Sequence, residues 1–163
     1  MQRRHREGLL LAAVLAFGSA PVLAAGSAAE ICAAGTGLPR EDVLVCTRAL
    51  ILPMLPAASI ATLHNARGRA LRLIGEPDKA LTAHNTALTL NPLSAEAHLG
   101  RAEARMVLGD AVAATADTRA ALALNPWLSG GWSLLGRIHF LTGDDPTAGA
   151  ALDKALELNA RDG

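Results

Sequence analysis

The sequence predicts an all-α solenoid, a stack of similar helix–turn–helix units, and three observations support this fold class. Gly75, Gly109 and Gly143 are spaced 34 residues apart, and an acidic residue follows each of them. Ala recurs five and twelve positions after each of these glycines. The tripeptide Leu-Asn-Pro at 90–92 recurs at 124–126. A period of this length is typical of a solenoid, in which each unit buries its apolar face by stacking on its neighbour.

The first element, residues 1–24, is predicted to be a secretory signal peptide. Three arginines precede an apolar run at 8–17, and Val22 and Ala24 provide the small residues of a cleavage site. We therefore expect cleavage after Ala24 and a periplasmic or secreted location, without a membrane contact afterwards. An uncleaved membrane anchor is the alternative, although the apolar run is short for a bilayer span.

The second element, residues 25–60, is interpreted as a half-repeat cap and a connector. Residues 42–50 resemble the second-helix stretch 80–88 of the first full unit. The only two cysteines are Cys32 and Cys46, and in an exported protein an even pair is most simply a disulfide. A redox-active pair is the alternative, but such cysteines are more often two residues apart. A Cys32–Cys46 bridge would contribute about 3 kcal/mol on the chain-entropy model.

Each 34-residue unit then divides into two predicted helices. In the first unit they span about 61–74 and 78–90, which are rich in the helix formers Ala, Leu and Arg. Gly75 is suited to end the first helix in a left-handed conformation, and Pro77 to begin the second. Asn91-Pro92 ends the second helix, because Pro disfavours a helical conformation in the residue before it.

The units resemble the tetratricopeptide repeat. The segment 132–136 (Trp-Ser-Leu-Leu-Gly) is similar to the opening W-x-x-L-G of that family, and Ala148 and Ala155 match its small positions. The Asn-Pro endings match its closing Pro. The resemblance implies a right-handed superhelix with units at 61–94, 95–128 and 129–162, within a repeat region at 61–163. The Cys-bearing half-repeat is similar to a feature of small exported members from Gram-negative bacteria.

Several positions depart from the family pattern. His64 and His98 stand where Trp132 stands in the third unit, and Ala102 replaces a Gly. The usual Tyr is replaced in all three units, by Leu71, Arg105 and His139.

In that family the first helix of each unit lines a concave groove that binds a protein or peptide. The resemblance places nine residues of this chain there: Asn65, Arg69, Arg72, Leu99, Glu103, Met106, Ser133, Arg137 and Phe140. Arg69 and Arg137 would flank an acidic or C-terminal carboxylate, and Met106 and Phe140 would accept an apolar anchor. Alternatively, these are solvated or packed positions of a scaffold. The family's carboxylate clamp for chaperone tails does not carry over, because three of its slots hold Gly100, Gly130 and Leu134.

Charge and composition argue against a nucleic-acid partner. The net charge is 0, and loss of residues 1–24 leaves 12 basic and 14 acidic residues, a net charge of −2. A nucleic-acid site needs a basic patch, and single strands need stacking aromatics, which make up 2% of this sequence.

No chemistry-bearing motif is visible in the sequence. The histidines lack metal-ligand spacing, and His64 and His98 are a full repeat apart. No nucleophile elbow or phosphate-binding loop occurs. We therefore expect no catalytic residues, no metal and no cofactor, and an enzyme on a helical scaffold is only a remote alternative.

The last expectation concerns assembly. The sequence ends at Gly163 without a polar capping helix, which predicts an apolar end face around Leu152 and Leu156. This face would pair with itself in a homodimer or dock on a partner. The sequence thus predicts an exported protein-interaction module. A self-associating adaptor or structural subunit of a cell-envelope complex, acting through its helix ends, is the alternative.

Overall fold

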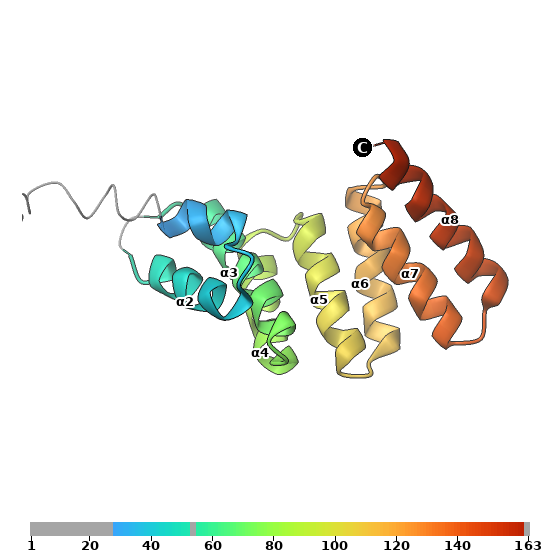
Figure 1. The fold of residues 1–163 in the computed structure, drawn as a ribbon, viewed down its shortest axis with the longest axis horizontal. Coiled ribbons are helices and arrows are strands. Elements are labelled where there is room, and N and C mark those ends of the chain that lie inside the picture. The colour runs from blue at the N-terminus through green and yellow to red at the C-terminus, as the bar shows by residue number, and fades with distance from the viewer. Residues whose placement is uncertain (1–27, 53–54, 162–163) are drawn as a thin grey trace, which may run out of the picture.

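The structure, a computed structural model, describes residues 28–52 and 55–161. The predicted signal peptide lies outside the described residues. A short helical segment at 28–34 comes first. The helices that follow are α2 (Pro39–Leu50), α3 (Ala57–Leu73), α4 (Pro77–Leu90), α5 (Ala95–Val107), α6 (Ala111–Leu124), α7 (Ser129–Leu141) and α8 (Asp145–Arg161). They lie side by side in one row, with α2 near one end and α8 at the other (Figure 1).

The helices pair as α3 with α4, α5 with α6 and α7 with α8, and each pair has the same turn. Gly75, Gly109 and Gly143 have φ values of 83°, 82° and 79°. A side chain is strained in this left-handed region, which explains the strict recurrence of Gly. The amide of the acidic residue after each Gly donates to a carbonyl five residues earlier, as from Glu76 to Leu71 at 2.9 Å. The predicted turns are therefore present.

The start of α3 differs from the expectation. The helix begins at Ala57, four residues before the predicted start at 61, and Pro56 is its N-cap. Residues 57–60 continue the Ala-rich composition of the helix, and nothing in them stops it. The α4 helix begins at Pro77, whose fixed φ suits a first helical position.

The predicted Cys32–Cys46 disulfide is present and joins the segment 28–34 to α2. Both cysteines are buried in a cluster with Ala49 of α2 and with Leu63 and Ala66 of α3. The bridge therefore holds two short helical pieces against the opening helix of the first unit.

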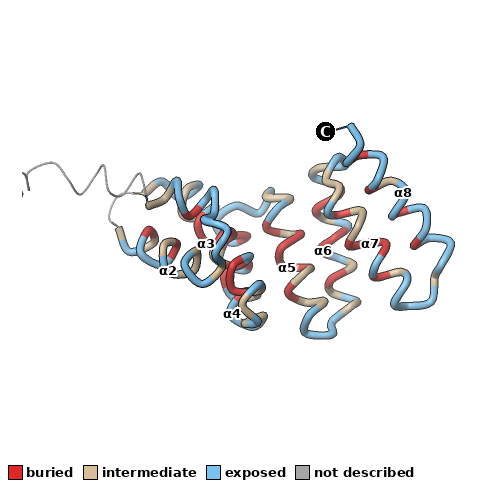
Figure 2. The backbone as a smooth tube through the Cα atoms, viewed as in Figure 1, coloured by how far each residue is buried: buried red, intermediate tan, exposed pale blue. Residues whose placement is uncertain are grey.

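Small side chains form the contacts within each unit. Ala80, Ala114 and Ala148 are 0%, 0% and 3% exposed, and the second Ala of each unit is equally buried. Small residues allow two helices to cross closely. The buried positions in Figure 2 recur along successive helices of the stack. Within residues 28–52 and 55–161, no helix is long and apolar enough to cross a membrane.

Candidate functional site

Four of the nine predicted groove residues line one hollow across α3, α5 and α7. We call it the central hollow; its volume is about 180 Å³. Its lining consists of Arg72, Glu103, Met106, Val107, Leu134, Arg137 and Leu141. Arg72 Nη2 lies 3.0 Å from Glu103 Oε2, and this ion pair joins α3 to α5. Arg137 is exposed and makes no ion pair with the described residues.

Asn65 and Arg69 line a different hollow, of about 210 Å³, between α3 and the turn that joins α4 to α5. We call it the first-unit hollow. It also contains Asn91, Ser94 and Glu96. Arg69 and Arg137 are therefore separated: α3 and α7 make no contact with each other, and α5 lies between them. The structure does not bring these two guanidinium groups to one ligand position.

The other three predicted residues have different surroundings. Leu99 is 7% exposed and packs in the core with Ala102 and Leu134. Ser133 is partly exposed. Phe140 is 66% exposed and lines a third, apolar hollow of about 420 Å³ with Arg137, Leu141 and Leu152. This end hollow lies between α7 and α8, at one end of the stack.

The side chain of Asn65 is engaged by a buried histidine. His84 is 0% exposed, and its Nδ1 lies 2.9 Å from Asn65 Oδ1. Burial, together with the charges of Arg72, Arg69 and Arg101, lowers the pKa of His84 to about 4. The ring is therefore neutral at pH 7, and its Nδ1–H donates to Asn65. A Cβ at Gly68 or Gly100 would lie 2.7 or 2.3 Å from the His84 ring, so only Gly fits beside it.

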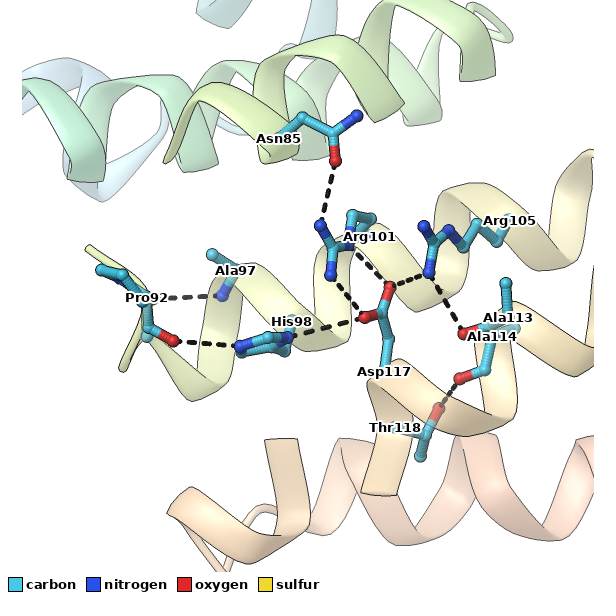
Figure 3. Close-up of polar contacts among 11 residues, drawn as sticks. Asn85, Pro92, Ala97, His98, Arg101, Arg105, Ala113, Ala114, Asp117 and Thr118 are labelled. Atoms are coloured by element: carbon cyan, nitrogen blue, oxygen red, sulfur yellow. Dashed lines mark hydrogen bonds and ion pairs between the residues drawn. The ribbon is translucent and has the colours of Figure 1, made fainter. Parts of the chain in front are cut away.

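The strongest polar cluster of the described chain was not predicted. Asp117 of α6 is 4% exposed and accepts from Arg101 Nε at 2.8 Å and Arg101 Nη2 at 2.7 Å (Figure 3). Arg105 Nη1 donates to the same carboxylate at 2.7 Å. Arg101 Nη1 also donates to Asn85 Oδ1 at 3.0 Å, which links α5 to α4. Two guanidinium groups thus pair with one buried carboxylate inside the second unit, and Arg101 also connects this unit to the first.

A signal for part of this cluster was present in the sequence. Arg101 and Arg105 are four residues apart, so they share one face of a helix. In the sequence, Arg105 stands out only as a replacement for the Tyr of the repeat pattern. The carboxylate partner lies 16 residues from Arg101, in another helix, and no local spacing indicates it.

The replacement of Trp by His at position 98 has a physical explanation. Trp132 Nε1 donates to the carbonyl of Pro126 at 2.8 Å. His98, one repeat earlier, has Nε2 3.0 Å from the carbonyl of Pro92. Because a carbonyl only accepts, the His98 proton is on Nε2. Both rings therefore tie the start of a first helix to the preceding Asn-Pro turn.

Within the described residues, no group of three or more His, Cys, Asp or Glu side chains is arranged to hold a metal ion. The buried His84 faces glycines and Asn65, and His98 Nδ1 lies 3.6 Å from Asp117 Oδ1, too far for a hydrogen bond.

Comparison with known proteins gives structural neighbours only. No family model matches the sequence, and no curated protein matches it. Among solved structures, MamA 41-end from Desulfovibrio magneticus RS-1 has a TM-score of 0.68 at 19% identity, covering 86% of this chain and 76% of that one. A crystal structure of MamA has a TM-score of 0.63 at 21% identity, covering 77% and 71%.

A third neighbour is the second TPR of Spaghetti (RPAP3) bound to the HSP90 peptide SRMEEVD. Its TM-score is 0.57 at 19% identity, covering 60% of this chain and 91% of that one. These likenesses define the class of fold. The chain folds as an all-α tetratricopeptide-repeat solenoid, and the resemblance expected from the sequence is confirmed at the level of the fold.

Proposed function

We propose that this protein is a non-catalytic interaction module that binds a protein or peptide segment in the groove formed by α3, α5 and α7. The observation that carries the proposal is the central hollow. There, the exposed Arg137 stands beside the Arg72–Glu103 ion pair, and Met106, Leu134 and Leu141 provide an apolar wall.

The chemistry of this hollow favours a segment with a carboxylate next to an apolar side chain. A guanidinium group binds a carboxylate through two parallel hydrogen bonds. The nearby apolar wall removes a neighbouring Leu- or Met-sized side chain from water, which stabilises the complex by about 1.5 to 3 kcal/mol when burial is complete. The Spaghetti (RPAP3) structure, with its acidic peptide SRMEEVD, shows that a solenoid of this fold holds such a segment.

The proposed location is the periplasm or the cell exterior, after removal of residues 1–24. The basic start and apolar run of that segment support export. The Cys32–Cys46 disulfide is in keeping with it, because disulfides persist mainly in oxidising compartments.

The groove is tested by partner capture with charge-reversal variants. Mature protein from Ala25 onward is cross-linked in a cell-envelope extract of its own host, beside Arg137→Glu and Arg69→Glu. Arg119→Glu is the matched control, since Arg119 is an exposed residue of α6 that lines none of the three hollows. We expect a partner that the wild type and Arg119→Glu capture and that Arg137→Glu loses.

The same assay measures whether the two arginines act together. Loss of the partner in Arg137→Glu but not in Arg69→Glu would assign recognition to the surface around Arg137 and exclude the first-unit hollow. Capture that is equal in all three variants would overturn the groove as the binding site.

A second candidate function is that of a self-associating subunit in a cell-envelope complex. Leu156, 67% exposed at the end of the stack, favours it. Static light scattering across a concentration series separates the two functions, because only the second requires a mass that rises above that of the monomer.

A further inference from the structure

The outer surface of α8 is equivalent to the surfaces of α4 and α6 that the following helix covers inside the molecule. Positions 88, 122 and 156 are equivalent in the three units, and all are Leu. Leu88 is 7% exposed and Leu122 9%, whereas Leu156 is 67% exposed. The positions four residues earlier are also equivalent in the three units and show the same contrast. His84 and Thr118 are 0% exposed, but Leu152 is 37% exposed.

The internal contacts show what covers this surface. Leu88 packs against Ala97 at the start of α5. Leu122 packs against Gly131 at the start of α7, where a Cβ would lie 2.8 Å from Leu122 Cδ2. In both cases a helix presents a small residue to the Leu. The covering face of α5 continues with Gly100, which lies against His84, and Ala104, which is buried with Ala83 of α4.

A charged side chain lies beside the apolar contact between α4 and α5. At the α4–α5 interface, Arg101 donates to Asn85 Oδ1 at 3.0 Å. The residue of α8 equivalent to Asn85 is Asp153. Asp153 is exposed and makes no ion pair with the described residues. A basic residue placed like Arg101 would therefore meet a carboxylate, which accepts a stronger hydrogen bond from Arg than an amide does.

We propose that the outer surface of α8, together with the end hollow, binds an amphipathic helix of a partner protein that continues the stack. We call this surface the end face; it consists of Phe140, Leu141, Leu152, Asp153 and Leu156. The partner helix presents small residues at positions i, i+3 and i+7 and a basic residue at i+4. That is the pattern of Ala97, Gly100, Arg101 and Ala104 in α5. This site adjoins the central hollow, with which it shares Arg137 and Leu141, and it continues the interface that already joins the units.

The probe for this site is a labelled peptide with the sequence of residues 91–108, closed by a side-chain staple between positions 99 and 103. The staple lies on the side of the helix opposite Ala97 and Arg101, and it reduces the cost of helix formation in a short peptide. Fluorescence anisotropy measures its binding to the mature chain. We expect saturable binding that weakens at least tenfold in the Leu156→Asp protein and at least tenfold for an Ala97→Leu peptide.

Exchanging the charges of Asp153 in the protein and Arg101 in the peptide tests how the peptide is aligned along α8. Asp153→Arg should weaken binding of the original peptide, and an Arg101→Glu peptide should bind Asp153→Arg better than it binds the wild type. Arg69→Ala, in the first-unit hollow, is the control and should leave binding unchanged. Because Leu156 and Asp153 are exposed, these variants keep the fold, and circular dichroism verifies that they do.

Several outcomes would overturn the proposal. They are no binding to the wild type, binding that Leu156→Asp leaves intact, or binding that Arg69→Ala removes. Light scattering that shows a wild-type dimer, converted to a monomer by Leu156→Asp and not dissociated by the peptide, would instead assign the end face to a second copy. Arg137 lines both the central hollow and the end hollow, so the two sites are separated by Leu156→Asp, because Leu156 lines neither hollow. This variant should lose the peptide and keep the partner captured by the groove, so failure of either site is recognised independently of the other.

Discussion

Two buried polar residues lie in the middle of the solenoid: Asp117 within the second unit, and His84 where the first unit meets the second. Arg101 and Arg105 donate to both oxygens of Asp117. His84 has lost its charge, because burial and nearby arginines lower its pKa to about 4. His84 lies against Gly68 of its own unit and Gly100 of the next, so it contributes to the stacking of units, whereas Asp117 joins the two helices of one unit.

The first prediction concerns Asp117. Substitution by Asn leaves the Arg101 and Arg105 guanidinium groups, both largely buried, without a counter-charge. Breaking such a buried ion pair costs on the order of 3 kcal/mol. Urea denaturation at pH 7 should therefore show a loss of about this size in the free energy of unfolding. The matched control is Asp153→Asn, an exposed change that should stay within about 0.5 kcal/mol.

The second prediction concerns pH. The pKa of His84 is about 4 in the folded protein and about 6.5 in the unfolded chain. The unfolded state therefore binds more protons as the pH falls from about 6.5 to 4, and stability is lost over that range. Between pH 7 and pH 5 the loss is roughly 2 kcal/mol. Below pH 4 both states are protonated at His84, and its contribution stops changing.

Nitrogen-detected NMR of the histidine rings tests this prediction site by site. The His84 signals should titrate with a midpoint near 4. A midpoint near 6.5 would show that water reaches the ring, and the predicted loss of stability would then not come from His84.

Sequence reasoning was least successful at the scale of single side chains. Asn65, predicted to line the groove, lines the first-unit hollow, but it is 8% exposed and its Oδ1 accepts from His84. The partner lies 19 residues away in another helix. Resemblance to a family indicates which helix faces the groove, but not which side chains are already bonded inside it.

At the scale of elements, the turns and helix ends were largely predictable, because their signals are local. Gly75 must adopt a positive φ, Pro77 begins a helix, and Asn91-Pro92 ends one. The starts of α2 and α3 lie earlier than the stretches expected from the sequence, at Pro39 and Ala57. No side chain caps the start of α3, and Pro56 is its N-cap.

The third prediction compares two glycines inside helices. A Cβ at Gly100 would lie 2.3 Å from the His84 ring, whereas a Cβ at Gly149 in α8 meets no atom within 4 Å. Gly100→Ala should therefore destabilise the protein by about 1 to 3 kcal/mol through overpacking. Gly149→Ala should stabilise it by roughly 0.5 to 1 kcal/mol, because Ala has the higher helix propensity. Thermal denaturation of both variants tests the pair, and changes of the same sign would contradict it.

At the scale of the whole molecule, the 34-residue period predicted the stack, and the even cysteine pair predicted its covalent link. The hollows were not predictable, since their shape depends on how far each unit turns relative to the last. Arg69 and Arg137 occupy equivalent positions in units one and three. They nevertheless line separate hollows, because a complete helix, α5, stands between their own helices.

The fourth prediction uses the equivalence of the units. Leu122 is 9% exposed and Leu156 67%, although they occupy the same position of their repeats. Leu122→Ala should cost about 2 to 3 kcal/mol, because it leaves a cavity between α6 and α7. Leu156→Ala should change the free energy of unfolding by no more than about 0.5 kcal/mol. Equal losses in urea denaturation would mean that the end face is covered in solution.

The hydrogen bond from Trp132 to the carbonyl of Pro126 has a consequence for spectroscopy. The chain has only two Trp residues and no Tyr, and both Trp127 and Trp132 lie at the connection between α6 and α7. Intrinsic fluorescence therefore reports on a single junction, whereas far-ultraviolet circular dichroism reports on every helix. If the two signals change at the same urea concentration, the stack melts as one cooperative body. If fluorescence changes at a different concentration, the third unit separates from the first two.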